Sequence, residues 1–309
     1  MGIVVMGAVF VDVKGYPFSK YIPEGRNAGN VEIVHGGVSR NVVEDIANVE
    51  LRPTFLSLVD DTGNGIEVID KLKRHKVDTS YMRTVKDGMG TWLAIFDTNG
   101  DVRGSISKRP DLMPIYDILC EQGDEIISKA DSIVLEFDID VITVKKTIEL
   151  AKKYNKKIFA VISNMSIAVA RRDLLEDIDC IVCNKQEAGI LFSEDYESLN
   201  EEEMEEVLVK KINGANIKQM VVTLGEKGAV YATLDGDRGY CPAWQVDVVD
   251  TTGAGDAFFS GVTIGLTYGK TMAEACNIGA RLAASVICTK DNVCPRFKPS
   301  EFGIEVNND

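Results

Sequence analysis

One segment near the C-terminal end carries residues whose types and spacing suit the transfer of a charged group. Residues 248–261 read Val-Val-Asp-Thr-Thr-Gly-Ala-Gly-Asp-Ala-Phe-Phe-Ser-Gly, an apolar entry followed by a helical pattern. Gly253 and Gly255 allow sharp turns and the close approach of a ligand. At a helix start the backbone amides and the helix dipole together form an anion-binding site. Asp256, in the first turn, is placed to accept a proton from a hydroxyl while that site holds a phosphoryl group.

The same residues also have a purely structural interpretation. Asp256 would then be an ordinary acid at a helix N-terminus, where negative charge is stabilising, and the glycines would form only a turn. The preceding Asp250-Thr251-Thr252 makes the seven-residue pattern much more specific than Gly-Ala-Gly-Asp alone. The catalytic interpretation is therefore preferred.

Other short patterns in the chain are weaker. Gly269-Lys270-Thr271 resembles the end of a P-loop, but Ile264 stands where that motif needs its first glycine, and the stretch follows a helix. Cys180 and Cys183 have the spacing of half a zinc site, yet no second close pair accompanies them, and the run indicates a buried strand. The eight acids between positions 194 and 206 indicate a solvated loop and helix start rather than a metal site.

Strand and helix patterns alternate along most of the chain. The predicted strands cover residues 2–11, 54–58, 133–137, 157–161, 180–183, 219–223 and 230–233. The predicted helices cover residues 38–47, 65–76, 142–154, 171–175, 200–212, 254–266 and 272–288. Such alternation predicts an α/β fold, with a mainly parallel sheet and helices on both faces.

Two segments interrupt this alternation. Residues 91–107 read as strand, Asn-Gly turn and strand, and residues 12–35 are mixed and rich in glycine. We expect both to form a small β-rich lid attached to the large sheet. Because no low-complexity linker divides the chain, we expect a single domain over residues 1–309.

The composition limits the class of protein. Of 309 residues, 45% are apolar and 27% charged, as in globular proteins. The net charge is −14, so we expect no nucleic-acid partner, because phosphate neutralisation needs clustered basic residues. A membrane-spanning helix needs about 20 consecutive apolar residues, and no apolar run in this sequence approaches that length. We therefore expect no membrane partner. The N-terminal residues indicate a buried strand rather than a signal peptide, and the seven cysteines then favour a reduced, cytoplasmic setting.

Four motifs together resemble those of the ribokinase-like (PfkB) carbohydrate kinase family. They are Gly36-Gly37-Val-Ser-Arg-Asn41, Asn184-Lys-Gln-Glu187, Thr223-Leu-Gly-Glu-Lys-Gly228, and Asp250–Asp256 followed by Ala-Phe. They occur in the family's order and span nearly the whole chain. The resemblance implies a ribokinase-like fold and an ATP-dependent kinase that phosphorylates an alcohol group.

The resemblance also implies roles for single residues in phosphoryl transfer. Asp256 is similar to the family's catalytic base, and the amides of Gly253, Ala254 and Gly255 to its anion hole. Asn184 and Glu187 resemble the pair that orders Mg²⁺ and the phosphates, with Glu187 acting through water. The residues implied to line the ATP site are Asn184, Thr223, Gly225 and Gly228.

Further positions are implied to bind the acceptor and a monovalent cation. The residues implied to contact the acceptor are Asp12, Gly37, Asn41 and Glu136. Asp250 and Thr252, with backbone near Ile287 and Asn292, resemble the family's K⁺ site. Of the two histidines, His35 adjoins the glycine pair and is a candidate for substrate contact, whereas His75 is expected on a helix surface.

The acceptor and the partner copy remain open at this stage. Val11–Gly15, Asn27–Val31 and the Gly36–Asn41 string resemble the pseudouridine kinase branch, which favours a nucleoside 5′-hydroxyl over a free pentose or hexose. A ribokinase- or fructokinase-type sugar kinase is the alternative, and a catalytically silent kinase-like binding protein is the alternative of another class. A lid with an open edge is also able to pair with a second copy, which suggests a homodimer.

Overall fold

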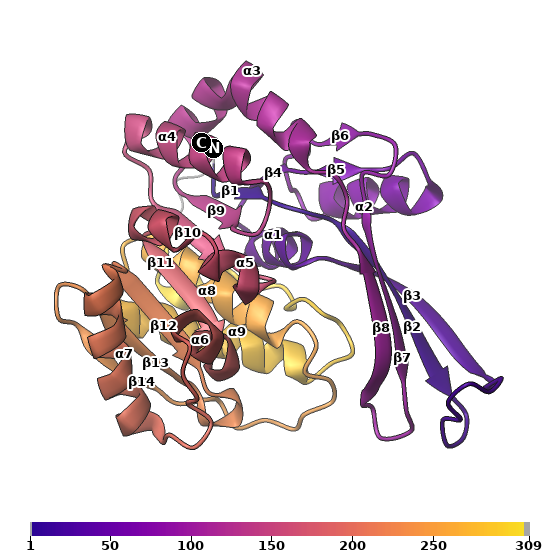
Figure 1. Ribbon diagram of the computed structural model, residues 1–309. Helices are drawn as coiled ribbons and strands as arrows, with labels where there is room; N and C mark the ends of the chain where they lie inside the picture. Colours follow the sequence, from indigo (N-terminus) through magenta and orange to yellow (C-terminus); the bar gives the residue numbers. More distant parts are fainter. Residues whose placement is uncertain (1, 306–309) are drawn as a thin grey trace.

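The computed structural model describes residues 2–305 and contains a mainly parallel sheet of eight strands, with helices on both faces (Figure 1). The strand order is β14-β13-β12-β11-β10-β9-β1-β4. These strands are β1 (Val4–Met6), β4 (Thr54–Leu56), β9 (Ile133–Glu136), β10 (Ile158–Val161), β11 (Cys180–Asn184), β12 (Gln219–Thr223), β13 (Ala229–Thr233) and β14 (Arg238–Cys241). All pairs from β4 to β12 are parallel, and β13 and β14 add an antiparallel edge. The predicted fold class is confirmed.

The strands of this sheet send alternate side chains into two cores. In β9, Ile133 and Leu135 face one core, and Val134 faces the other. The first core is covered by α3 (Met113–Lys129), α4 (Val141–Tyr154), α5 (Met165–Val169), α6 (Lys185–Phe192) and α7 (Glu201–Ala215). The second is covered by α1 (Val38–Asn48), α2 (Gly63–Arg74), α8 (Ala254–Thr267) and α9 (Met272–Ile287). None of the helices within residues 2–305 is long and apolar enough to span a membrane.

The same alternation separates the two cysteines of the 180–183 run. Cys180 packs in the second core and Cys183 in the first, and both are buried. Burial raises the pKa of both thiols. Since the two side chains point to opposite faces of the sheet, they do not converge on one ion, and the predicted buried strand is confirmed.

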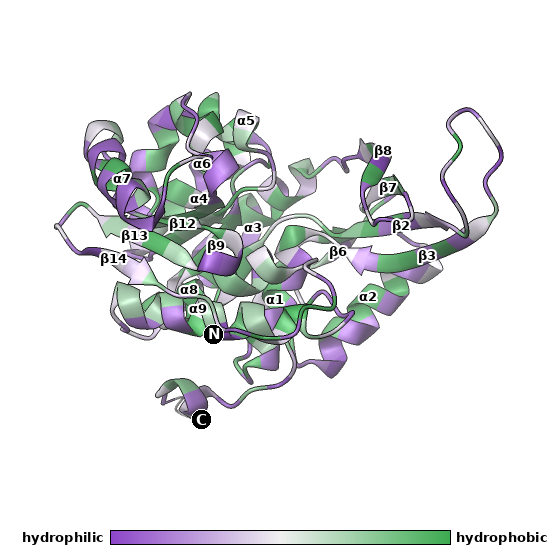
Figure 2. Ribbon diagram, turned by 90° about the horizontal axis from the view of Figure 1, so that it is seen from below, coloured by the Kyte–Doolittle hydropathy of each residue, from purple (hydrophilic) through white to green (hydrophobic). Residues whose placement is uncertain are grey.

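A second sheet of four strands forms the lid, which projects from the body of the molecule (Figures 1 and 2). Its strands are β2 (Phe10–Pro17), β3 (Gly29–Gly36), β7 (Gly90–Phe96) and β8 (Val102–Lys108), in the order β3-β2-β7-β8. Residues 12–35 and 91–107 thus supply most of this sheet. A short parallel pair, β5 (Leu58–Val59) and β6 (Arg83–Thr84), flanks α2 in sequence.

The predicted strand over residues 2–11 is wrong in its boundaries, because the chain changes sheets within it. β1 ends at Met6, and β2 begins at Phe10. Gly7 makes the passage, and a Cβ there would lie 2.0 Å from Ser39 Oγ and 2.3 Å from Glu136 Oε2. Apolar residues continue through the break because Ala8 and Val9 are buried too, so hydrophobicity did not reveal it.

Several elements were not predicted. The longest is α3, which carries Ile115, Ile118, Leu119, Ile126 and Ile127 on its buried side and has a proline in its first turn. The spacing of these residues is that of a helix face. The other unpredicted elements are α5, α6 and β14, together with the 3₁₀ helices 225–227 and 299–302. The helix predicted over 171–175 is a 3₁₀ helix over Arg172–Asp177.

Candidate active site

A glycine turn starts α8 and leaves space for a ligand in front of the helix. Gly253 has a φ of 84°, and a Cβ there would lie 2.2 Å from the carbonyl oxygen of Asn292, so only glycine fits. At Gly255 an added Cβ would meet nothing within 4 Å. The Ala254 amide donates to the Thr251 carbonyl at 3.2 Å, so one of the three predicted amides is already engaged. Within the described residues, the amides of Gly253 and Gly255 remain for an anion.

Asp256 lies in the first turn of α8 and is held from α1. Its Oδ2 accepts a hydrogen bond from Nδ2 of Asn41 at 2.6 Å. Burial raises the pKa of Asp256 to about 6, while the Asn41 bond and the Arg40 charge act in the opposite direction. The negative charges of Asp12 and Glu187 add to this rise in the pKa of Asp256. Asp256 is therefore a carboxylate at neutral pH, with more basicity than a surface aspartate.

The paired glycines bring the lid strand β2 against the start of α1. Gly37 has a φ of 97°, and a Cβ there would lie 2.8 Å from the Ala8 carbonyl oxygen. A Cβ at Gly36 would lie 2.4 Å from Oδ2 of Asp12. Oδ1 of Asn41 is buried and has no hydrogen-bond partner within residues 2–305. Asp12, Asn41 and Asp256 thus offer several polar groups to one ligand.

Arg40, which the sequence analysis assigned to no site, holds this turn from behind. Its side chain is 1% exposed. Nη2 donates to the carbonyl of His35, Nε donates to that of Gly36 at 3.4 Å, and Nη1 pairs with Glu44 Oε2 at 2.6 Å. The guanidinium fixes two consecutive carbonyls in front of Gly37, because its donors form a rigid fork. A sequence motif does not reveal this role of Arg40, because the role depends on the conformation of the turn that presents the two carbonyls.

The two histidines both contact groups on α1 or α2. The His35 ring lies 3.7 Å from Glu67, so the structure gives its contact to α2 rather than to the cluster around Asp256. His75 was expected on a helix surface, and this is wrong. Its Nδ1 lies 2.6 Å from Oδ1 of Asn48, and its Nε2 lies 3.9 Å from the buried Glu44. Burial lowers the pKa of both imidazoles.

Glu136 ends β9 and lies beside the same cluster. Its Oε2 accepts from the Ala8 amide at 2.9 Å and from Ser39 Oγ at 2.7 Å. Ser39 stands two residues before Asn41 on α1. Burial raises the pKa of Glu136 to about 7. This carboxylate joins β9 to α1 and to the segment between β1 and β2, and it also lines a pocket.

On the other side of Asp256, the predicted Mg²⁺ pair caps a helix. Asn184 Oδ1 accepts from the Glu187 amide at 2.8 Å, and Glu187 Oε2 accepts from the Asn184 amide at 2.8 Å. This capping box leaves the second carboxylate oxygen of Glu187 without a hydrogen bond within the described residues. Burial raises the pKa of Glu187.

The predicted ATP residues lie at the adjoining strand ends. Asn184 and Thr223 are partners in the register of β11 and β12, and with Gly225 they line a pocket of about 450 Å³. Gly228 has a φ of 110°, and a Cβ there would lie 2.1 Å from the Cys241 carbonyl oxygen. Gly228 therefore closes the turn before β13 against β14, and it is not among the residues that line this pocket.

The predicted cation segment rests on the end of α9. The amides of Val249 and Asp250 donate to the Ile287 carbonyl at 2.7 and 3.3 Å. Oδ1 of Asp250 accepts from the Thr252 amide at 2.8 Å. Asn292 packs against Gly253, and its Nδ2 donates to the backbone carbonyl of His35 at 3.1 Å. Asp250 and Thr252 thus lie beside the Ile287 carbonyl, and their role at a cation stays a prediction.

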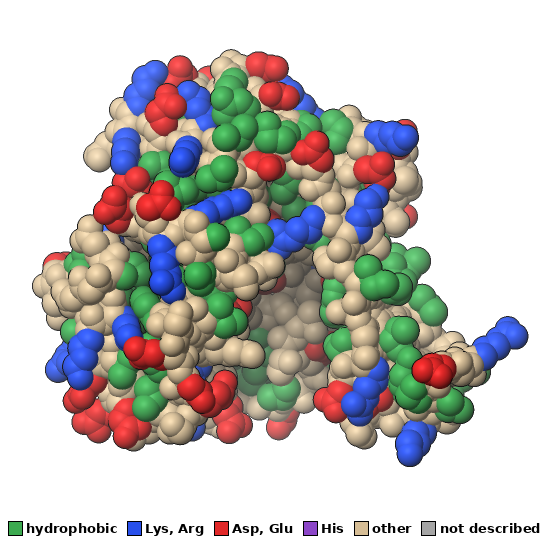
Figure 3. Space-filling view, in the orientation of Figure 1, with side chains coloured by type: hydrophobic (Ala, Val, Ile, Leu, Met, Phe, Trp, Pro, Cys, Tyr) green, Lys and Arg blue, Asp and Glu red, His purple; other side chains and the backbone are tan. Residues whose placement is uncertain are grey.

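These groups lie along one edge of the central sheet, under the lid. The space-filling view shows a deep hollow between the lid and the body (Figure 3). Among the predicted residues, Asp256 and Asn41 are joined by a hydrogen bond. Asp12 lies against Gly36, the residue before Gly37. Within residues 2–305, no group of three or more His, Cys, Asp or Glu side chains is arranged as a metal cluster.

Comparison with known proteins finds related chains over nearly the whole length of this one. A model of the "pfkB family carbohydrate kinase" matches residues 2–295. A guanosine-inosine kinase of Exiguobacterium acetylicum is 34% identical over 295 residues, covering 94% of this chain and 95% of that protein. The pseudouridine kinase of Escherichia coli (strain K12) is 23% identical and covers 88% and 86%. The structure of Arabidopsis thaliana ribokinase complexed with ribose and ATP has a TM-score of 0.83 at 20% identity, with 97% of each chain covered.

The raised pKa of Asp256 predicts a pH-dependent reaction. A base works only when deprotonated, so kcat/KM should fall as the pH drops below about 6. Asn41→Leu should move this limb to higher pH, because the Asn41 hydrogen bond lowers the pKa of Asp256. We would measure kcat/KM between about pH 5 and 9 for the parent and for Asn41→Leu, and compare the pH at which each falls to half of its maximum. A limb that stays in place in the Asn41 variant would contradict the assignment.

The same pKa predicts a stability effect. The pKa of Asp256 is about 6 in the folded state and 3.8 in the unfolded state. Ionisation of Asp256 therefore lowers the free energy of unfolding, with its full effect above pH 6 and no effect well below pH 3.8. Asp256→Asn should therefore raise the melting temperature at pH 8, and most of this gain should be lost at about pH 4. Asp124→Asn is the control, since hydrogen bonds from Lys153 and Tyr154 lower the pKa of that exposed carboxyl and its loss should not stabilise. An equal gain at both pH values would contradict the argument.

Proposed function

The chain belongs to the pfkB family of carbohydrate kinases, and we propose from this premise that it transfers the γ-phosphoryl group of ATP to the 5′-hydroxyl of a nucleoside. The observation that carries the proposal is the hydrogen bond between Asn41 and Asp256, which sets a basic carboxylate in front of the free amides of α8. An acceptor hydroxyl and a transferring phosphoryl group meet at such a place.

Asp256 is the proposed base. Its free Oδ1 takes the proton of the acceptor hydroxyl as the oxygen attacks phosphorus, while Asn41 holds Oδ2. Phosphoryl transfer depends mainly on positioning and charge stabilisation, so a single well-placed carboxylate suffices. The amides of Gly253 and Gly255, with the dipole of α8, stabilise the negative charge on the transferred group.

The donor set suits Mg²⁺ held mainly by phosphates and water. The ion prefers oxygen ligands and commonly takes one or two carboxylates beside substrate phosphates. Glu187 offers one such carboxylate oxygen, and no larger acidic cluster exists within residues 2–305. When bound, Mg²⁺ would neutralise phosphate charge. Glu187 and Asn184 would orient its water ligands, in accord with the role expected from the resemblance.

The ATP is proposed to lie over the ends of β11 and β12. Asn184, Thr223 and Gly225 line the pocket there, and Gly228 shapes the turn. Asp250 and Thr252, with the carbonyls near Ile287, are proposed to hold K⁺ beside the start of α8. A bound cation there would stabilise the backbone that leads into the anion site.

The acceptor is proposed to lie between the lid and α1. Asp12 and Asn41 would bind ribose hydroxyls, Gly37 lets the chain approach closely, and Glu136 closes the far side. A relative named guanosine-inosine kinase at 34% identity supports a purine nucleoside, and one named pseudouridine kinase at 23% supports a nucleoside more generally. A nucleoside bearing a 6-oxopurine is the first candidate, and pseudouridine the second.

Turnover with a panel of acceptors tests this function. Inosine, guanosine, pseudouridine, adenosine, ribose and fructose are each incubated with ATP and Mg²⁺, and ADP and the phosphorylated position are measured by ³¹P NMR. We expect the nucleosides to give 5′-monophosphates. Asp256→Asn should lower kcat by about 10²- to 10⁴-fold, because it removes the base and its charge.

Asp247→Asn is the matched control, since Asp247 is exposed in the segment before the same turn and should leave kcat within twofold. Sugars accepted in preference to every nucleoside would point to a sugar kinase. Absence of ADP with every acceptor, although ATP binds, would favour the silent binding protein.

The lid is proposed to pair with a second copy. On the face of the sheet opposite Asp12, Ile33, Val13, Leu93 and Ile106 form one cross-strand row through all four strands. Ile33 and Ile106 are 61% and 69% exposed. An exposed apolar face across a whole sheet marks an interaction surface.

Charge placed in this row should dissociate the dimer. Ile33→Asp would bury a carboxylate against apolar neighbours, so light scattering coupled to size exclusion should give a dimer for the parent and a monomer for the variant. Ile190→Asp is the control, because Ile190 is 44% exposed on α6, a helix of the body that packs on β11 and β12. A parent protein that is monomeric at about 10 µM would overturn the pairing.

A further inference from the structure

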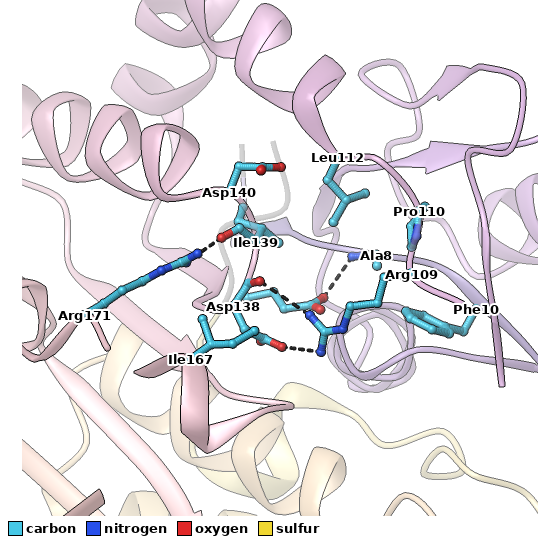
Figure 4. Close-up of a pocket in the computed structure, with 11 residues that line it drawn as sticks. Ala8, Phe10, Arg109, Pro110, Leu112, Asp138, Ile139, Asp140, Ile167 and Arg171 are labelled. Atoms are coloured by element: carbon cyan, nitrogen blue, oxygen red, sulfur yellow. Dashed lines mark hydrogen bonds and ion pairs between the residues drawn. The ribbon is translucent and has the colours of Figure 1, made fainter. Parts of the chain in front are cut away.

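A pocket of about 200 Å³ opens beside Glu136, where the lid meets the body (Figure 4). For scale, an apolar cavity of about 150 Å³ accepts benzene. The space therefore suits a planar ring system rather than a single ion. Its lining comes from the start of β2, the residues after β8, the residues after β9 and α5.

The pocket continues from the proposed ribose site. Glu136 borders both, since it lines the pocket and its Oε2 accepts from the amide of Ala8, beside Gly37, at 2.9 Å. Ala8 belongs to both as well, because its side chain lines the pocket and its carbonyl packs against Gly37. A molecule that places a hydroxyl at Asp256 and hydroxyls at Asn41 would extend its other end into this space.

Two walls of the pocket are apolar and suit the faces of a ring. Phe10 forms the wall on the lid side, and Ile139 and Ile167 lie across from it (Figure 4). The Phe10 ring is held in place by the lid, since a Cβ at Gly90 would lie 2.4 Å from it. Flat aromatic faces and branched aliphatic side chains bind heteroaromatic rings by stacking and van der Waals contact.

One polar group at this pocket is the guanidinium of Arg109, which directly follows β8; the other charged lining residues are Glu136, Asp138, Asp140 and Arg171. Its Nη2 donates to Asp138 Oδ2 at 2.5 Å and to Ser163 Oγ at 2.9 Å, and its Nη1 reaches the Asp138 carbonyl at 3.4 Å. The Asp138 side chain is wholly buried, whereas that of Arg109 is 40% exposed. Since arginine carries five N–H donors, donors that include Nε are left without a partner within residues 2–305.

Asp138 is itself fully engaged in holding this arginine. Its Oδ2 also accepts from Ser163 Oγ at 2.6 Å, and its Oδ1 accepts from the Ser163 amide at 3.2 Å. Arg171 braces the same segment by donating to the carbonyls of Phe137 and Ile139 at 2.9 and 2.5 Å. The guanidinium is thus preorganised at the pocket wall, which lowers the entropy lost when it binds a ligand.

We propose that this pocket holds the base of the nucleoside and that Arg109 selects bases presenting acceptor atoms, such as the carbonyl and ring nitrogen of a 6-oxopurine. This inference rests on the proposed function and names its substrate class. Guanine and hypoxanthine present O6 and N7 as two neighbouring acceptors, and the Nε of Arg109 is able to donate to either of them. Adenine presents an amino donor in place of O6, and a guanidinium, having only donors, opposes it.

Equilibrium binding of inosine and adenosine, measured by calorimetry without ATP, tests this pocket separately from turnover. The parent protein should bind inosine at least about tenfold more tightly than adenosine. Arg109→Met keeps the length of the side chain but removes the donors and should abolish this preference. Arg103→Met is the matched control: Arg103 lies on β8 and pairs with Asp97, so its loss should leave the preference unchanged.

A second variant guards against a folding defect in Arg109→Met. Ile167→Trp fills the pocket from α5, leaves Arg109 in place, and should abolish inosine binding while ribose still binds. Equal affinity for the two nucleosides in the parent, no binding of either, or a preference retained in Arg109→Met would each overturn the inference. An Arg109-dependent preference in a protein that transfers no phosphate would leave the pocket standing and defeat only the kinase proposal. If the protein phosphorylates inosine and Arg109→Met retains the preference, the kinase proposal stands and the role of Arg109 in the pocket fails.

Discussion

The hydrogen bond between Asn41 and Asp256 is the interaction on which the site depends, because it joins two helix starts from opposite ends of the chain. Each of these helices, α1 and α8, begins at a glycine with positive φ, and each glycine lies against a carbonyl that leaves no room for a Cβ. Gly37 meets Ala8, and Gly253 meets Asn292. The two turns are therefore set by backbone packing, and their side chains meet because the helices cannot shift apart.

Buried polar groups behind these turns hold the two helices together. Asp45 on α1 accepts from the Cys294 amide at 2.7 Å and from Ser260 of α8 at 3.3 Å. Burial raises the pKa of Asp45 to about 8, so it carries a proton at neutral pH and adds little charge near Asp256. Arg40 and Glu44 form a buried pair on the same helix. Removing one partner of such a pair costs far more than exchanging both, which explains how a charged network persists in a core.

Local sequence patterns predicted the machinery of transfer better than its surroundings. Gly253 and Asp256 lie within one specific motif of seven residues, so their placement together at a helix start was predictable without the fold. The sheet was also predictable, since its strands are short buried runs separated by helical patterns. The break at Gly7 was not, because a close contact with Ser39 and Glu136 across the fold creates it. The role of Arg40 was hidden for the same reason, as its partners are backbone carbonyls that any residue supplies.

Selection of the acceptor depends on residues that no short motif contains. Phe10 opens β2, Arg109 follows β8, and Asp138 follows β9, so the pocket forms only when lid and body come together. The ion pair between Arg109 and Asp138 crosses that junction. A ligand seated there contacts lid and body at once, and its binding energy can thus order the lid over the reacting groups and exclude water. Substrate choice and protection of the phosphoryl group then arise from one contact, which links recognition of the base to transfer at a distant hydroxyl.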